Sequence, residues 1–102
     1  MASRVAHDPL LAMYRRGQID LPTFRAARAF QRATNRAAIE AAIVRQTGTL
    51  GLALVRAVVA GATIADAARE LGANSPRDVG SCGWWLRRSL RAVAIRIGER
   101  VV

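Results

Sequence analysis

One stretch, from Thr63 to Asp78, constrains the fold of this chain more than any other. It begins with Thr63 and Asp66, whose spacing is that of a capping pair at the start of a helix. Gly72 follows, at the place where a glycine in the left-handed conformation ends a helix. Ser75 and Pro76 then repeat the start signal, because serine caps helices well and proline favours the first helical position. The pattern predicts two helices joined by a tight turn, which is the layout of a helix-turn-helix.

Similar start and stop signals divide the rest of the chain. Asp8-Pro9 predicts a short helix to about Arg16, and Asp20-Leu21-Pro22 opens a second helix. With no glycine or proline to interrupt it, this second helix is expected to span Pro22–Gln46 and to close at Gly48. A third helix is expected over Thr49–Ala60, and the last one runs to about Ile97. No strand pattern or repeat is visible, so we expect an all-α, five-helix bundle in one domain, 1–102, with the helix-turn-helix at about 63–97.

Apolar residues at steps of three and four mark the expected core faces. In the second helix these are Phe30, Ala33, Ala37, Ala41 and Val44. In the fourth they are Ile64, Ala67, Ala68 and Leu71, and in the last Val79, Gly83, Leu86, Leu90, Val93 and Ile97. Gly80 and Gly83 each weaken the first turns of the last helix by about 1 kcal/mol relative to alanine. That helix therefore starts either at Ser75 or, in regular form, only near Ser81.

The net charge of the chain indicates the class of partner that it binds. It carries 16 basic residues, all arginine, against seven acidic ones, a formal net charge of +9. Arginine is suited to bidentate contacts with phosphate and guanine, although a GC-rich genome also explains the absence of lysine. The surplus of positive charge favours a polyanionic partner. A helix-turn-helix in such a chain indicates double-stranded DNA.

The face of the last helix opposite its apolar residues is the expected DNA-binding surface. It presents Arg77, Ser81, Trp84, Arg88 and Arg91. Arg77, Asp78 and Ser81 are placed to reach base edges, and Arg87, Arg88 and Arg91 to contact phosphates. Trp85 is expected to be more buried than Trp84. If the helix starts late, Ser81, Trp84, Trp85 and Arg88 would replace Arg77 and Asp78 as readers of the bases.

A second basic surface is expected on the Pro22–Gln46 helix. Arg25, Arg28, Arg32 and Arg36 follow one another at steps of three and four, so they share one face. This stripe is either a set of secondary contacts to the DNA backbone or a solvated face partly neutralised by an Arg36–Glu40 pair.

The stretch Thr63–Asp78 resembles sigma-factor region 4 and related helix-turn-helix domains. Asp8-Pro9-Leu10, the arginine-rich segment Phe24–Arg36 and the segment Leu50–Leu90 resemble an uncharacterised alphaproteobacterial helix-turn-helix family. The resemblance implies a bacterial, cytoplasmic, nucleoid-associated DNA-binding protein that regulates transcription, with Ser81–Ala94 matching the recognition helix. The chain departs from the family at 74–80, which is longer than the usual turn. A homodimer or a contact with RNA polymerase would enlarge the small surface of one such motif.

Other classes of function find less support in the sequence. A phage small terminase subunit also combines a helix-turn-helix with an oligomerising helix, and a non-enzymatic protein-interaction adaptor could use the same basic surface. The acidic residues are scattered, and the single cysteine, Cys82, and the single histidine, His7, lack metal-ligand neighbours. We therefore expect no enzyme activity, no cofactor and no metal. The longest apolar stretch, Leu50–Ala60, is too short to cross a membrane, so no membrane partner is expected.

Overall fold

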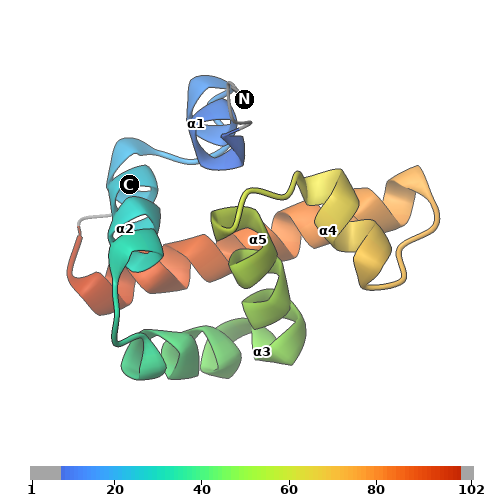
Figure 1. Cartoon of the computed structure of the whole chain (residues 1–102). Helices are drawn as coiled ribbons and strands as arrows, with labels where there is room; N and C mark the ends of the chain where they lie inside the picture. Colours follow the sequence, from blue (N-terminus) through green and yellow to red (C-terminus); the bar gives the residue numbers. More distant parts are fainter. Residues whose placement is uncertain (1–7, 100–102) are drawn as a thin grey trace, which may run out of the picture.

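The computed structural model describes residues 8–99, and this part of the chain is all-α, with five helices and no strand (Figure 1). This confirms the fold class predicted from the sequence. The helices are α1 (Pro9–Arg15), α2 (Leu21–Arg32), α3 (Ala37–Val59), α4 (Ile64–Glu70) and α5 (Pro76–Ile97). The expected bounds of the first, fourth and fifth helices agree with these within two residues.

Helix α5 is the central element of the bundle. It packs against α2, α3 and α4, while α1 packs against α2 and α3 (Figure 1). Its buried face contributes Leu86, Leu90 and Val93, which are fully buried and meet Leu54 and Phe30 in one core. The predicted apolar face of α5 is thereby confirmed from Gly83 to Val93, whereas Ile97 is exposed at the end of the helix.

The predicted continuous helix over Pro22–Gln46 is wrong, because α2 ends at Arg32 and α3 begins at Ala37. Ala33 leaves the helix with an extended backbone, and the Asn35 side chain accepts a hydrogen bond from the Ala37 amide (3.4 Å). The guanidinium of Arg36 donates to the carbonyl oxygens of Ala33 (3.1 Å) and Gln31 (2.9 Å), which the end of α2 leaves unpaired. Local side-chain hydrogen bonds thus replace the helical ones that a continuous helix would make.

The break also overturns the predicted apolar stripe beyond Phe30. Ala37, Ala41 and Val44 are exposed, whereas Ala42 and Ile43 are buried. A helix that restarts at Ala37 in a new direction no longer shares a face with α2, so the spacing from Phe30 carries no information about it.

Helix α3 is itself sharply bent at Gly48, where the chain was expected to break. Gly48 has φ 73° and ψ −171°, and the two halves of α3 run in different directions (Figure 1). Glu40 in the first half accepts two hydrogen bonds from Arg56 in the second, at 2.9 and 3.0 Å. These hydrogen bonds hold the pKa of the Glu40 carboxyl below its usual value. The expected Arg36–Glu40 pair is therefore replaced by a Glu40–Arg56 pair that bridges the bend.

We expect Gly48→Ala to lower the free energy of unfolding by about 1–3 kcal/mol, because only glycine adopts this backbone conformation without strain. An added Cβ would meet nothing within 4 Å, so the loss would come from the backbone alone. Gly80→Ala is the matched control, since Gly80 lies within α5 and also has open space around it. Alanine there should raise the free energy of unfolding by about 0.5–1 kcal/mol. Urea unfolding followed by circular dichroism compares the two. Equal effects would contradict the assigned bend.

Candidate nucleic-acid interface

The segment from α4 to α5 has the local structure that its sequence predicts. Thr63 Oγ1 accepts a hydrogen bond from the Asp66 amide (3.0 Å) at the start of α4. Gly72 follows α4 with φ 99°. Ser75 Oγ then accepts from the Asp78 amide (3.2 Å), with Pro76 as the first residue of α5. Helix α5 therefore starts at its early position, and the alternative of a regular helix only from Ser81 is wrong.

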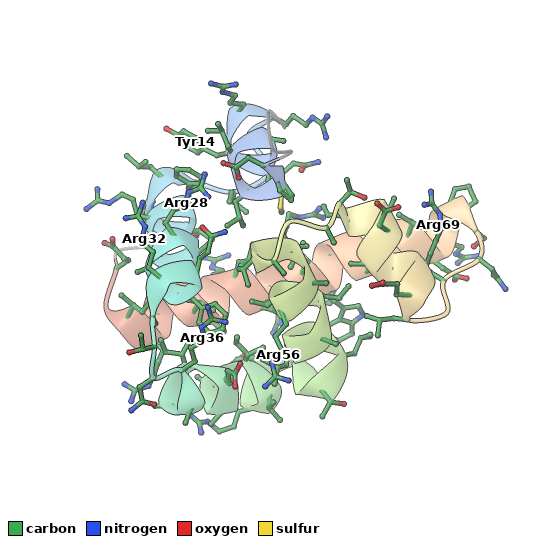
Figure 2. All side chains as sticks on the ribbon, in the orientation of Figure 1. Tyr14, Arg28, Arg32, Arg36, Arg56 and Arg69 are labelled. Atoms are coloured by element: carbon green, nitrogen blue, oxygen red, sulfur yellow. The ribbon has the colours of Figure 1, made fainter. Side chains whose placement is uncertain are left out.

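Helix α4 packs on α5 through small side chains. Ala67 and Ala68 are buried, and Ile64 is half-buried against the core. Leu71, also expected on the buried face, is 43% exposed because α4 has ended before it, at Glu70. The acid expected to complete the cap, Asp66, instead accepts a hydrogen bond from Arg69 (2.9 Å) on the outer side of α4 (Figure 2).

The face of α5 opposite its core residues is exposed along much of the helix. Its members follow one another at steps of four, three, four and three, namely Arg77, Ser81, Trp84, Arg88 and Arg91. We call this set the α5 stripe. Asp78 is also exposed beside it. Five of the positions expected to face the DNA therefore share one side of α5, whereas Asp78 lies on one flank of this face and the half-buried Arg87 on the other.

Aromatic contacts fix the middle of the α5 stripe. Trp84 is 48% exposed, whereas Trp85 is half-buried and packs against the core, as predicted. The two indoles meet edge to face with 4.8 Å between ring centroids. The Arg88 guanidinium lies over the Trp84 ring at 5.4 Å, a cation–π contact that holds its charge at the surface.

A groove runs beside the α5 stripe, and its second wall is the α1–α2 turn. This open hollow of about 610 Å³ is lined on the α5 side by Trp84, Arg87, Arg88 and Arg91. Opposite them lie Tyr14, Gly17, Gln18, Ile19, Asp20 and Thr23. The α1–α2 turn was not predicted from the sequence to belong to the site. Only the exposed aromatic Tyr14, next to two arginines, could have indicated it.

Within residues 8–99, Arg87, Arg88 and Arg91 form no ion pair. The acid in the groove, Asp20, accepts a hydrogen bond from the Thr23 amide (2.9 Å) as the cap of α2. Three guanidinium groups against one carboxylate leave the groove positively charged. Such a surface attracts phosphate groups.

The second basic surface differs from its prediction. Arg36 lies outside α2, so the four arginines do not share one helix. Arg25 pairs with Glu99 (3.4 Å), and Arg28 pairs with Asp8 and lies over the Phe24 ring. Arg36 lies over the Phe30 ring at 4.8 Å, between α2 and α3, whereas Arg32 points outward from α2 (Figure 2). Three of the four arginines therefore each contact another part of the fold.

Other chemistry in the described part of the chain is sparse. Across residues 8–99, no three His, Cys, Asp or Glu side chains gather closely enough to hold a metal ion. Cys82 is buried, and the Ser81 hydroxyl donates to the Arg77 carbonyl (3.2 Å). His7 lies outside the described residues.

One helix of the described chain, α3, is long and apolar enough to cross a membrane by length and composition alone. This is weak evidence, because α3 is bent at Gly48 and buries Leu54, Val55 and Val58 in the core.

Comparison of the chain with protein-family models, with curated proteins and with solved structures finds no match.

Proposed function

We propose that this chain is a transcription regulator that binds double-stranded DNA through a helix-turn-helix formed by α4 and α5. The observation that carries the proposal is the α5 stripe, an exposed row of arginine, serine and tryptophan side chains on a helix that begins at Ser75–Pro76. The first turns of such a helix would enter the major groove, with Arg77, Asp78 and Ser81 at base edges. Arg87, Arg88 and Arg91 would contact phosphates on the flank. A cytoplasmic, nucleoid-associated location in a bacterium follows from this role.

The difference between arginines that form ion pairs and arginines that do not supports the proposal. Within residues 8–99, the arginines that pair with acids are Arg25, Arg28, Arg56 and Arg69, and none of these belongs to the α5 stripe. The charges that remain available for a partner therefore include those of α5. Since phosphate binding releases counterions, affinity should fall steeply with added salt.

The test is fluorescence anisotropy of a labelled duplex across a salt series. Arg77→Ala/Arg88→Ala should bind at least about tenfold more weakly than the wild type, with a salt slope smaller by about two. Arg45→Ala/Arg96→Ala is the matched control, because it removes two exposed arginines that lie outside the α5 stripe. That control should keep most of the affinity.

Three results would count against this proposal. An absence of duplex binding at low salt would overturn it for the isolated chain and favour a protein-interaction adaptor. An equal loss of affinity in both double variants would mean that duplex binding depends on the net charge of the chain and not on the α5 stripe. A ring-shaped oligomer in solution would instead favour a small terminase subunit.

A further inference from the structure

We propose that the groove between the α1–α2 turn and α5 binds a nucleotide unit, with its phosphate on the arginines of α5 and its base against Tyr14 and Trp84. Nucleotide binding here does not depend on duplex binding, although the groove shares Trp84, Arg87, Arg88 and Arg91 with the surface proposed above. It assigns a ligand to a part of the molecule, the α1–α2 turn, that a helix-turn-helix does not use.

The chemistry of the two walls carries this inference. One wall supplies three guanidinium groups, from Arg87, Arg88 and Arg91, which no described acid pairs. Guanidinium groups bind phosphate in bidentate fashion. The hollow of about 610 Å³ is open, so the phosphate of a nucleotide can enter it while the rest of a strand stays outside.

Aromatic side chains on both walls distinguish a nucleotide from inorganic phosphate. Tyr14 on α1 (Figure 2) is 36% exposed, and the stacked contact with Phe24 (5.0 Å between centroids, 15° between planes) fixes its ring. On the opposite wall, Trp84 is 48% exposed and contacts both Arg88 and Trp85. Rings held in place at the edge of a basic groove are platforms on which bases stack without sequence preference.

The neighbouring polar groups fit the same ligand. Gln18 lines the groove from the α1–α2 turn and carries an amide that both donates and accepts hydrogen bonds. A phosphate alone would use neither the aromatic rings nor the Gln18 amide, whereas a base and ribose would use both.

The test uses Trp84 as the reporter, by titrating tryptophan fluorescence with adenosine monophosphate and, separately, with a short single-stranded oligodeoxyadenylate. A base stacked near Trp84 should quench its emission, and Trp84→Phe should remove that quench while Trp85 continues to emit. Arg91→Ala and Tyr14→Ala should each weaken binding about tenfold. Tyr14→Phe should keep the affinity, because it keeps the ring. The matched control is Arg96→Ala, an exposed arginine of the same helix that does not line the groove.

Each outcome decides the proposal. Quenching by both probes, or by the oligonucleotide alone, supports it, and the comparison tells whether the nucleotide must be part of a strand. Quenching by neither probe overturns it, as does a quench that survives Trp84→Phe or an equal loss in Arg96→Ala. Arg91 is exposed, so its variant keeps the test valid if Tyr14→Ala unfolds. Duplex binding measured separately distinguishes the two proposals, because a duplex that binds without any nucleotide quench retains only the first.

Discussion

Phe30→Ala should lower the free energy of unfolding by about 3–5 kcal/mol, the range for removing a large buried aromatic side chain. Phe30 is fully buried and is among the largest fully buried side chains of the core. Natural domains are stable by only about 5–15 kcal/mol, so this single change should leave the chain close to unfolding. Thermal and urea unfolding followed by circular dichroism give the measurement.

The loss at Phe30 has a second component beyond the cavity. The Arg36 guanidinium rests over the Phe30 ring while it donates to the carbonyl oxygens of Gln31 and Ala33. Replacing Phe30 with alanine therefore also removes the ring that Arg36 packs on, and Arg36 is the side chain whose hydrogen bonds satisfy the end of α2. Phe30→Leu is the control, because it keeps most of the apolar volume and should cost less than about 1.5 kcal/mol. A loss below that value for Phe30→Ala would show that this position is not in a packed core.

The contacts of Arg36 illustrate the difference between the features of the fold that could be predicted from the sequence and those that could not. The caps at Thr63 and Ser75 are local, since each side chain bonds a backbone amide three residues away. Local signals of this kind are present in the sequence itself. The break between α2 and α3 depends instead on Arg36 reaching back to Phe30 and to two carbonyl groups. No glycine or proline occurs at this break. The spacing of apolar residues therefore predicted one helix through Ala33 and Ala37, although the helix is interrupted there in the structure.

The candidate site likewise has one part that could be predicted from the sequence, the α5 stripe, and one that could not, the groove. The α5 stripe follows from helical periodicity and from the apolar residues on the opposite face, so all five of its members were predicted and are exposed. The groove required a contact between segments far apart in the chain, the α1–α2 turn and α5. A single sequence does not show which residues of two distant segments will be in contact. The predicted single face of four arginines is wrong because Arg36 lies outside α2, and the partners of Arg25 and Arg28, which are Glu99 and Asp8, also lie outside that helix.

Gly51→Ala should lower the free energy of unfolding by about 3 kcal/mol, at the upper end of what overpacking usually costs. Gly51 is buried in the second half of α3, close to α5. A Cβ added there would lie 1.8 Å from Thr47 Oγ1 and 2.5 Å from Ser89 Oγ. Neither hydroxyl can move freely, because the two oxygens are 2.7 Å apart and Ser89 is fully buried with its hydroxyl on the Trp85 carbonyl (2.8 Å).

Two comparisons separate this clash from the ordinary effect of replacing a glycine. Gly83→Ala changes another buried helical glycine, where the added Cβ would meet Arg87 Nη1 at 3.5 Å and Ile64 Cγ2 at 3.9 Å, which are ordinary contacts. It should be neutral or stabilising. Thr47→Ala should partly rescue Gly51→Ala, so the double variant should lose less than the sum of the single losses. Additive losses, or a Gly51→Ala variant as stable as Gly83→Ala, would contradict the crowding of Gly51 by Thr47 within α3 and, at the close approach of α3 to α5, by Ser89. Since this approach positions the helix that carries the α5 stripe, its loss would also be expected to weaken any binding along that stripe.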